Sequence, residues 1–316
     1  MKLIQPSFEI LDQEPGLKGI YKAIEYPGRI CYGSTDKMTE DSAEEFVHKL
    51  EKANHGAPME HGAVYLQITR NVDVDEWLSP NLEYTKYSEL KEFYSNNRYS
   101  KVEEVLCVNL KDHLYISTNY RVLFENNRLD DLKYLSEPTE YHRRRVTVKF
   151  ICNIGVSREF NRHRADSINE ESTRYCNYSK DKYGNEINVI ANNNKFGNRI
   201  EELEKKNRAE DIKAYCLQIL KGEDSEFSDI DYWLFANMAS EYSYMGLTQQ
   251  CGWNAQDARD VLPLDTKSIL VHSAFIDDWK HFFDLRAIGT TGAPHPQAKE
   301  LAKPLMEEFK KRNLID

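Results

Sequence analysis

The sequence of 316 residues contains no apolar run of the roughly 18 residues that a membrane-spanning helix needs. Its first residues, MKLIQPSFEILDQEP, combine no basic stretch with an apolar one and offer no small-residue cleavage site. They therefore do not resemble a secretion signal. We expect a cytoplasmic protein with no membrane partner.

Cysteine is sparse, and its placement favours no metal or disulfide framework. The six cysteines form no Cys-x-x-Cys pair and no zinc-type spacing. In a cytoplasmic protein we expect them to be reduced and mostly to fill core positions. By spacing alone His55 and His61 could hold a metal ion, but no third ligand lies near them in sequence. We predict no metal site.

Positive charge is in deficit over the whole chain. The 42 Lys and Arg residues against 52 Asp and Glu give a net charge of −10, which repels nucleic acid at long range. Against this background seven basic residues lie close together in sequence: Arg143, Arg144, Arg145, Lys149, Arg158, Arg162 and Arg164. This local clustering favours a small anionic ligand, and we expect no nucleic-acid partner.

The chain has the composition of a folded globular protein, with 40% hydrophobic and 11% aromatic residues and no low-complexity tract. Apolar residues that alternate predict strands at 61–70, 113–124 and 145–154. Amphipathic periodicity predicts helices at 41–56, 198–222, 228–245, 254–263, 275–287 and 295–312. A short helix is expected around 88–96 and a loop over 176–198. The pattern is α+β: one domain over 1–316 with helices segregated to one side or end of an antiparallel sheet.

The stretch RHRADSINEESTRY, residues 162–175, concentrates three arginines, a histidine and two adjacent glutamates. Arginine presents a fixed fork of donors that matches phosphate and carboxylate oxygens. The segment ADSIN is poor in helix formers, so the chain is expected to turn into a loop there. On a loop, Ser172 and Arg174 could present a hydroxyl and a guanidinium to one phosphate, and Glu170 could accept from a sugar hydroxyl or a ring N–H.

A plainer interpretation of the same stretch needs no ligand. Arg162 could pair with Glu170, and Arg174 with Glu171, as salt bridges on a surface loop. Charges that converge away from water are costly unless something organises them, which weighs slightly against this interpretation. Composition alone does not separate the two.

The spacing Arg-His-Arg, seven residues, then Ser is similar to the signature of flavin-dependent thymidylate synthases. Here it consists of Arg162–Arg164, then ADSINEE, then Ser172, and the likeness extends to Asn169, Glu170, Arg174 and Tyr175. Three further segments resemble the family in the same order: HGAPMEH (55–61), DARDVLP (257–263) and WKHFFDLRA (279–287). Together these segments span most of residues 20–305.

This resemblance implies a fold and a reaction. The fold would have a central twisted antiparallel sheet with flanking helices, and residues 71–143 would be an insertion in the sheet region that the family does not usually have. The protein would be a homotetramer whose active sites are shared between subunits. It would bind FAD and convert dUMP to dTMP, with methylenetetrahydrofolate as the carbon donor and NADPH as the reductant.

The resemblance also implies roles for individual residues. The flavin would contact His61, Arg162, His163, Arg164, Asn169, Glu170 and His281. The nucleotide dUMP would contact Glu159, Arg162, Glu170, Glu171, Ser172, Thr173, Arg174, Arg259 and Arg286. Arg286 would be the catalytic residue, because a cation against uracil favours its ionised N3 form and so makes C5 more nucleophilic. Ser172 has no base beside it in sequence, so it is assigned to the phosphate.

Several of these residues also fit structural roles. A cation near a helix end is favoured by the helix dipole, which could explain Arg286. Arg259 could pair with an aspartate on its own helix. His61 could be a hydrogen-bonded histidine of a sheet, and His281 could belong to the core.

The chain departs from the family pattern at three positions. Glu159 stands where glutamine is common, and Phe275 and Asp277 replace an asparagine and an arginine that often help to hold FAD. Glu159 leaves a second reaction open, in which the product is 5-hydroxymethyl-dUMP. A third possibility is a nucleotide- or RNA-binding protein without catalysis. Retention of both flavin-facing and uracil-facing residues argues against it.

Overall fold

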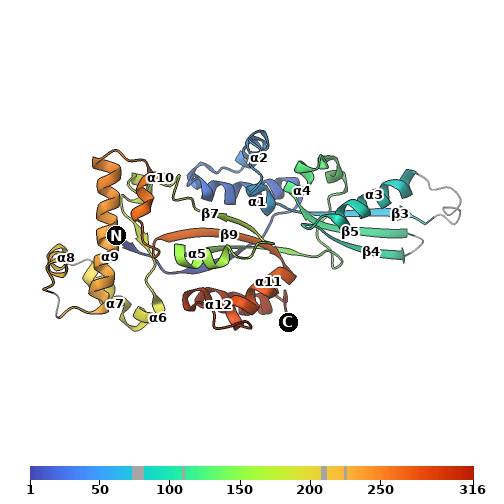
Figure 1. The fold of residues 1–316 in the computed structure, drawn as a ribbon. Helices are drawn as coiled ribbons and strands as arrows, with labels where there is room; N and C mark the ends of the chain where they lie inside the picture. Colours follow the sequence, from blue (N-terminus) through green and yellow to red (C-terminus); the bar gives the residue numbers. More distant parts are fainter. Residues whose placement is uncertain (73–81, 109–110, 208–211, 224–225) are drawn as a thin grey trace.

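Three sheets organise the chain, and the computed structural model describes residues 1–72, 82–108, 111–207, 212–223 and 226–316 (Figure 1). A four-stranded sheet has the order β2-β6-β9-β7, and a three-stranded sheet has the order β3-β5-β4. Both are antiparallel, whereas β1 and β8 form a short parallel pair. The strands are β1 (Lys2–Leu3), β2 (Ser7–Leu11), β3 (Ala63–Asn71), β4 (Lys101–Val108), β5 (Lys111–Asn119), β6 (Arg145–Asn153), β7 (Ser167–Glu170), β8 (Asn188–Val189) and β9 (Lys267–Phe275).

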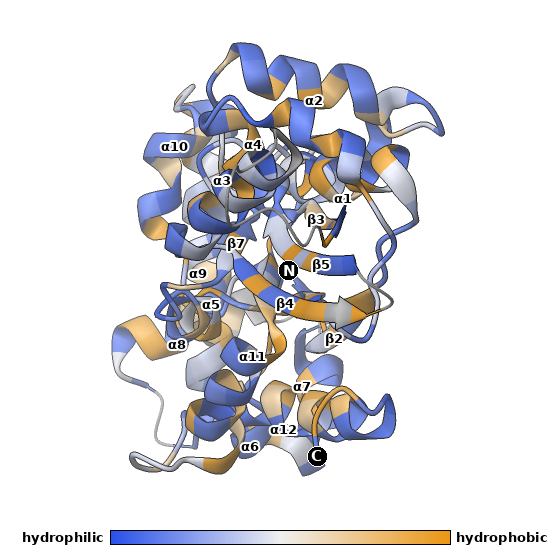
Figure 2. Ribbon diagram, turned by 90° about the vertical axis from the view of Figure 1, so that its right-hand side faces the viewer, coloured by the Kyte–Doolittle hydropathy of each residue, from blue (hydrophilic) through white to orange (hydrophobic). Residues whose placement is uncertain are grey.

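The helices cover different parts of this framework. They are α1 (Gly16–Cys31), α2 (Ser42–Lys52), α3 (Leu82–Asn96), α4 (Tyr120–Glu125), α5 (Ile154–Phe160), α6 (Asn193–Phe196), α7 (Ile200–Asn207), α8 (Ile212–Lys221), α9 (Asp229–Met245), α10 (Ala255–Ala258), α11 (Ile276–Phe283) and α12 (Pro296–Lys311). Figure 1 shows β9 running through the middle, the three-stranded sheet with α3 at one end and α7–α9 at the other. Figure 2 shows α1 and α2 on one side of the sheets and α11 and α12 on the other.

The core of the four-stranded sheet lies between its inner face and the C-terminal helices. Alternate residues of β6 are buried, as the alternation at 145–154 predicts. On α11, Trp279, Phe282 and Phe283 share one helical face and are fully or almost fully buried. Phe150 of β6 packs against Phe282, and Trp279 packs against Phe309 of α12.

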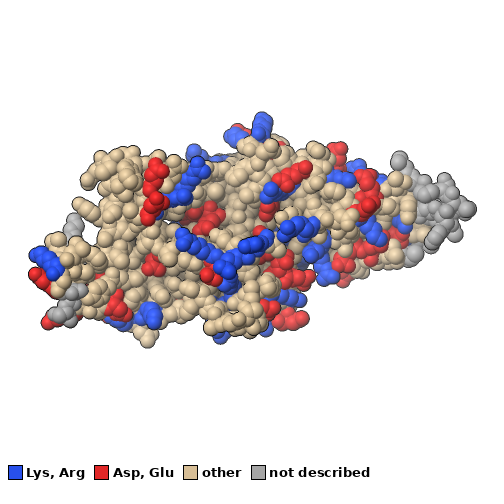
Figure 3. Space-filling model, viewed as in Figure 1, with Lys and Arg blue, Asp and Glu red and all other residues tan. Residues whose placement is uncertain are grey.

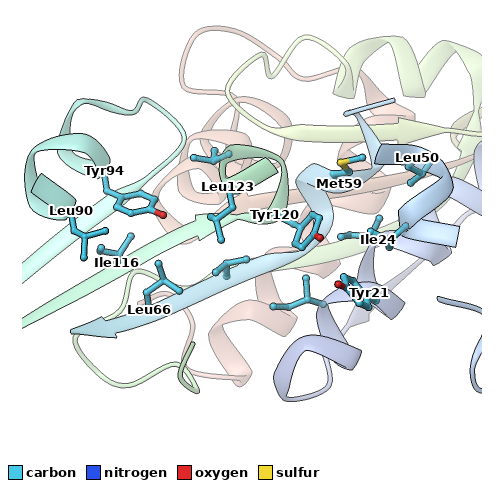
Figure 4. Close-up of a cluster of buried hydrophobic side chains, with 14 of the residues drawn as sticks. Tyr21, Ile24, Leu50, Met59, Leu66, Leu90, Tyr94, Ile116, Tyr120 and Leu123 are labelled. Atoms are coloured by element: carbon cyan, nitrogen blue, oxygen red, sulfur yellow. The ribbon is translucent and has the colours of Figure 1, made fainter. Parts of the chain in front are cut away.

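A second core belongs to the three-stranded sheet and the N-terminal helices (Figure 4). Leu66 of β3 and Ile116 of β5 are fully buried against α1 and α3 residues such as Ile24 and Leu90. This core also buries tyrosine rings. The hydroxyl of Tyr94 donates to Asp131 at 3.1 Å, so the ring is buried while its polar end is satisfied.

The structure confirms the strands predicted at 61–70 and 145–154 and corrects others. The strand predicted at 113–124 ends at Asn119, whose side chain caps α4 by accepting from the backbone N–H of Val122. Residues 71–112 contain a longer helix than expected and the strand β4, which pairs with β5. The loop expected at ADSIN is wrong, because Ser167–Glu170 form β7 on the edge of the four-stranded sheet.

The predicted helices at 228–245 and 295–312 are confirmed as α9 and α12. The one at 254–263 is shorter, with α10 followed by a 3₁₀ turn at Arg259–Val261. The one at 198–222 is represented by α7 and α8, and its residues 208–211 lie outside the described residues. The helix predicted from residue 275 begins at Ile276, because β9 occupies 267–275, a strand that the pattern did not predict.

The observed class is a mixed helix and sheet protein with antiparallel sheets, as predicted, but its larger strands divide between two sheets. The single twisted central sheet, the single domain over 1–316 and the status of 71–143 as an insertion stay predictions. Among the described residues, no helix has both the length and the apolar character that a membrane crossing requires.

Candidate functional site

The Arg-His-Arg segment begins where α5 ends. The side chain of Asn153 caps the start of this helix, and Phe160 at its end is fully buried between Phe150 and Phe282. The chain then turns, with the backbone N–H of His163 donating to Phe160 at 3.2 Å. His163 is buried, whereas the residues on either side of it, Arg162 and Arg164, are exposed. The turn therefore places one histidine inward and two guanidinium groups outward.

The opposite wall comes from α11 and the turn that follows it. The buried ring face of α11 fixes the helix against the sheet, and a π-helical turn at Asp284–Ile288 carries Arg286. This turn ends at Gly289, whose φ of 88° is in the left-handed region. A Cβ there would lie 2.7 Å from the carbonyl oxygen of Gly292, so glycine is required by both conformation and space.

These two walls enclose a pocket of about 310 Å³. Its lining residues are Arg162, His163, Arg164, Ala165, Asp166, Asp278, His281, Leu285 and Arg286. Figure 3 shows Lys and Arg side chains in a band across the middle of one face of the molecule, the face on which α5 and α11 are seen in Figure 1. Five of the residues that the resemblance assigns to flavin or uracil thus line one pocket.

Arg286 is held by three hydrogen bonds at this pocket. Its Nη1 donates to Glu159 Oε2 at 2.6 Å, its Nη2 donates to the backbone oxygen of Glu159 at 2.6 Å, and its Nε donates to His163 Nε2 at 3.2 Å. Its side chain is 12% exposed. The partner of the unusual Glu159 is therefore the predicted catalytic arginine, and Glu159 itself does not line the pocket in the described structure.

The neighbourhood of His163 favours its neutral form. Burial lowers the pKa of His163 to about 4, helped by the nearby His272, Arg286 and His281 and opposed by Asp166. The ring of His281, which is exposed, lies 5.9 Å from that of His163. The structure therefore places His281 on the surface of the pocket and not in the core.

His61 lies in the interior and does not line this pocket in the described structure. Its Nδ1 is 2.7 Å from the hydroxyl of Ser273 on β9, and that hydroxyl is 2.7 Å from the hydroxyl of Thr147 on β6. Burial lowers the pKa of His61 to about 3, and the Arg145 guanidinium contributes. These contacts agree with a hydrogen-bonded histidine of a sheet, while its predicted place beside a flavin stays a prediction.

The second half of the motif makes contacts that differ from the predicted salt bridges. Glu170 accepts from Asn161 at 3.0 Å and from Ser268 at 2.7 Å, and Glu171 accepts from Lys267 at 2.5 Å. The plainer interpretation, in which Arg162 pairs with Glu170 and Arg174 pairs with Glu171, is therefore wrong. Asn169, which precedes Glu170, is buried and belongs to β7.

A turn after β7 brings the predicted phosphate ligands to α10. The Oγ of Ser172 accepts from the backbone N–H of Arg174 at 3.3 Å, with Thr173 between them. The Nε of Arg174 donates to Gln256 of α10 at 3.1 Å, and the exposed Arg259 follows three residues later. The structure therefore brings the turn at 172–174 next to the helix that leads to Arg259.

The pocket and this turn lie at opposite ends of β7. Asp166, on the pocket, precedes the strand, and the pairing continues through Glu171, whose N–H donates to Ile269. Five extended residues span about 17 Å at roughly 3.3 Å per residue.

A buried pair that the sequence patterns did not indicate lies behind the pocket. Asp166 Oδ2 is 2.6 Å from His272 Nε2, and both side chains are at most 2% exposed. The ring of His272 lies 4.4 Å from that of Trp279 on α11. Asp166 is inside the motif, so the motif could have pointed to it, but its partner is on β9, the strand that was missed.

The clustered cations have several different partners. Arg143 pairs with Glu103, Lys149 pairs with Glu9, and Arg145 is tied to Ser167 at 2.9 Å. Only part of the cluster therefore belongs to the pocket. The two histidines considered as metal ligands have separate partners. His55 is hydrogen-bonded to Tyr32, and His61 is hydrogen-bonded to Ser273. Within the described ranges, no three His, Cys, Asp or Glu side chains are grouped as metal ligands.

Comparison with known proteins gives a family match. The family model described as thymidylate synthase complementing protein matches residues 138–313. No curated protein matches the chain. Among solved structures, a UMP/dUMP methylase PolB from Streptomyces cacaoi is similar in its complexes with 5-bromo-dUMP and 5-bromo-UMP. Identities are 15% and 14% and TM-scores 0.38 and 0.40, over 98% of this chain and 93% and 92% of the other.

Proposed function

Because the chain belongs to the thymidylate synthase complementing protein family, we propose that it is a flavin-dependent thymidylate synthase that converts dUMP to dTMP. The observation that carries the proposal is the position of Arg286. It lies on the wall of one pocket with the Arg162–Arg164 segment, although the two are more than 120 residues apart in sequence. The methyl carbon would come from methylenetetrahydrofolate and the reducing equivalents from NADPH.

Arg286 would act on the uracil ring. A cation against the carbonyl oxygens favours the form of uracil that is ionised at N3, and the negative charge of that form makes C5 a better nucleophile toward the incoming carbon. The three bonds to Glu159 and His163 preorganise this cation. Two of the five guanidinium N–H groups remain for a ligand.

FAD would bind at this pocket through its cationic residues. Arg162 and Arg164 are exposed cations at its rim and can bind a pyrophosphate or a ring carbonyl. Phe275 has no polar side chain and its ring lies 5.0 Å from the Arg145 guanidinium, so FAD would be held by the other assigned residues, the Arg-His-Arg segment among them. When bound, FAD would supply hydride transfer and carry the carbon.

The phosphate of dUMP would bind at the turn after β7. Ser172 and Arg174 can offer a hydroxyl and a guanidinium, and Arg259 can add a second cation. Because this turn and the pocket lie at opposite ends of β7, one nucleotide would use the pocket of one chain and the turn of another. We propose that these shared sites belong to a homotetramer, as the family resemblance implies.

Mixing two inactive variants tests the sharing. Arg174→Ala removes the phosphate contact and Arg286→Ala removes the uracil contact, so each homotetramer should be inactive. After subunit exchange, a mixed tetramer should regain part of the activity, because some sites combine the intact halves. No recovery, with exchange shown by native mass spectrometry, would contradict shared sites.

Product analysis tests the reaction itself. The protein is mixed anaerobically with FAD, NADPH, methylenetetrahydrofolate and dUMP, and the nucleotide is identified by mass spectrometry. A gain of one methyl group supports the proposal. A hydroxymethyl product would keep the site and replace the reaction, and Glu159 beside Arg286 is the feature that leaves this open. Tight FAD and dUMP binding without product would favour a binding protein.

A further inference from the structure

The hydrogen bond between Arg286 and His163 fixes the position of a proton. Arg286 Nε donates to His163 Nε2 at 3.2 Å. A guanidinium has donors and no acceptor and stays protonated in proteins. The nitrogen that accepts from it must carry a lone pair. The ring proton of His163 is therefore on Nδ1.

Glu159 holds the donor of this bond in place. Its carboxylate and its backbone oxygen each accept from a different terminal nitrogen of Arg286, both at 2.6 Å. With these two bonds formed, the guanidinium plane cannot rotate and Nε stays directed at His163. Glu159 belongs to α5, and this helix is anchored by the buried Phe160.

The second nitrogen of His163 remains available. Within the described part of the chain, Nδ1 of His163 has no hydrogen-bond partner. It is also not a buried atom, because the buried polar atoms that lack a partner do not include it. His163 lines the pocket, so its Nδ1–H can meet a ligand there. Burial also lowers the pKa of His163 to about 4, which keeps the ring neutral at physiological pH.

We propose that Glu159 is a positioning residue that, through its bonds to the uracil-facing Arg286, presents His163 to the pocket as a neutral hydrogen-bond donor through Nδ1–H. The matching ligand group is an uncharged acceptor, namely a ring carbonyl or ring nitrogen of a heterocycle. A neutral imidazole polarises such an acceptor without transferring a proton to it. The tautomer follows from the chain alone, whereas the choice of a pyrimidine or flavin as the acceptor rests on the proposed function.

Nitrogen-15 NMR of the full chain, labelled at the histidine rings and free of ligand, reads this tautomer directly. The signals of His163 are assigned by their loss in His163→Gln. At pH 7 we expect a protonated Nδ1 and an unprotonated Nε2, a pattern that persists as the pH falls toward about 4. A protonated Nε2 at pH 7, in the neutral or the charged ring, would overturn the inference.

Variants separate positioning from mere stability. Glu159→Gln keeps an oxygen that can accept from Arg286, so it should retain the single tautomer. Glu159→Ala should lose it, and Arg286→Gln gives a second route to the same loss if Glu159→Ala folds poorly. A single unchanged tautomer in folded Glu159→Ala would remove Glu159 from the proposal. His48→Gln, an exposed change on α2, is the matched control and should leave the His163 signals unchanged.

The ligand part is tested with FAD and dUMP as separate probes. Binding of the ligand that accepts from His163 should shift the Nδ1 signal. If both probes bind and neither shifts it, the assignment of the acceptor is wrong. Absence of any nucleotide product with the tautomer intact would reject the proposed reaction and leave the positioning of His163 standing.

Discussion

The four-stranded and the three-stranded sheets bury polar groups in different ways. Behind the pocket, the four-stranded sheet buries His272 with Asp166 and His61 with Ser273, so imidazoles lie in the interior. The three-stranded sheet buries apolar side chains and tyrosine rings whose hydroxyls reach carboxylates such as Asp131, and it also buries the imidazole of His142 and most of the Arg70–Asp112 ion pair between β3 and β5. Burying ionisable groups is costly, and stability alone does not require it. Both sheets bury ionisable groups, and what distinguishes the four-stranded sheet is that one of them, Asp166, also lines the pocket.

The extent of the family match agrees with this contrast. Residues 138–313 include β6, β7 and β9 of the four-stranded sheet, α5, and the helices α11 and α12. All three strands of the other sheet lie before residue 138. We therefore expect changes around the pocket to affect turnover, and changes in the three-stranded sheet to affect only the stability of the fold.

The largest effect is expected for Arg286→Ala. Turnover of dUMP should fall by about 100-fold or more, because a preorganised cation is lost. Binding of FAD, followed by the quenching of its fluorescence, should largely survive. The matched control is Arg128→Ala near the three-stranded sheet, where the guanidinium pairs with Glu89 and lies over Phe93. It should lower the free energy of unfolding by about 1–3 kcal/mol and leave turnover per folded molecule unchanged. Near-normal turnover in Arg286→Ala would show that its assignment is wrong.

A second test compares two buried contacts. Asp166→Ala leaves His272 buried without its partner, and breaking a buried pair in this way costs about 3–5 kcal/mol. Tyr94→Phe removes one hydroxyl bond to Asp131, and about 1 kcal/mol is expected because Arg128 still faces that carboxylate. Urea unfolding measures both. Equal losses in the two variants would mean that the pair behind the pocket is an ordinary contact.

The pH dependence of stability should be steeper with His61 than without it. The unfolded histidine takes up a proton near its ordinary pKa of about 6.5, while the folded one resists until about pH 3. The unfolded state therefore binds more protons between these values, and stability falls as the pH is lowered through this window. One such group contributes about 1.4 kcal/mol per pH unit. His61→Gln should reduce the slope by roughly that amount between pH 6 and 5, and an unchanged slope would contradict its burial as a neutral ring.

The smallest effect is expected at the surface cations. Arg143 and Glu103 form an exposed pair, which contributes about 0–1 kcal/mol. Arg143→Ala should leave turnover unchanged and shift the melting temperature only slightly, as differential scanning fluorimetry would show. Loss of turnover in Arg143→Ala would show that Arg143 belongs to the functional site.

The sequence predicted the parts of the site that are local. The Arg-His-Arg segment, the helix with Trp279 and the strand β6 carry their own periodicity or spacing. It did not predict contacts made across β9, because Lys267–Phe275 had no recognised strand pattern and the partner of Asp166 lies there. Nor did it predict that ADSIN would extend, since β7 is held by pairing with β9 and not by its own composition.

Release of tritium from [5-³H]dUMP tests the central claim most directly, because any new carbon at C5 must displace the hydrogen there. With FAD, NADPH and methylenetetrahydrofolate present, we predict release of tritium to water by the unaltered chain and by Arg128→Ala, and almost none by Arg286→Ala. Retention of tritium by the unaltered chain, with FAD and dUMP both bound, would contradict the account.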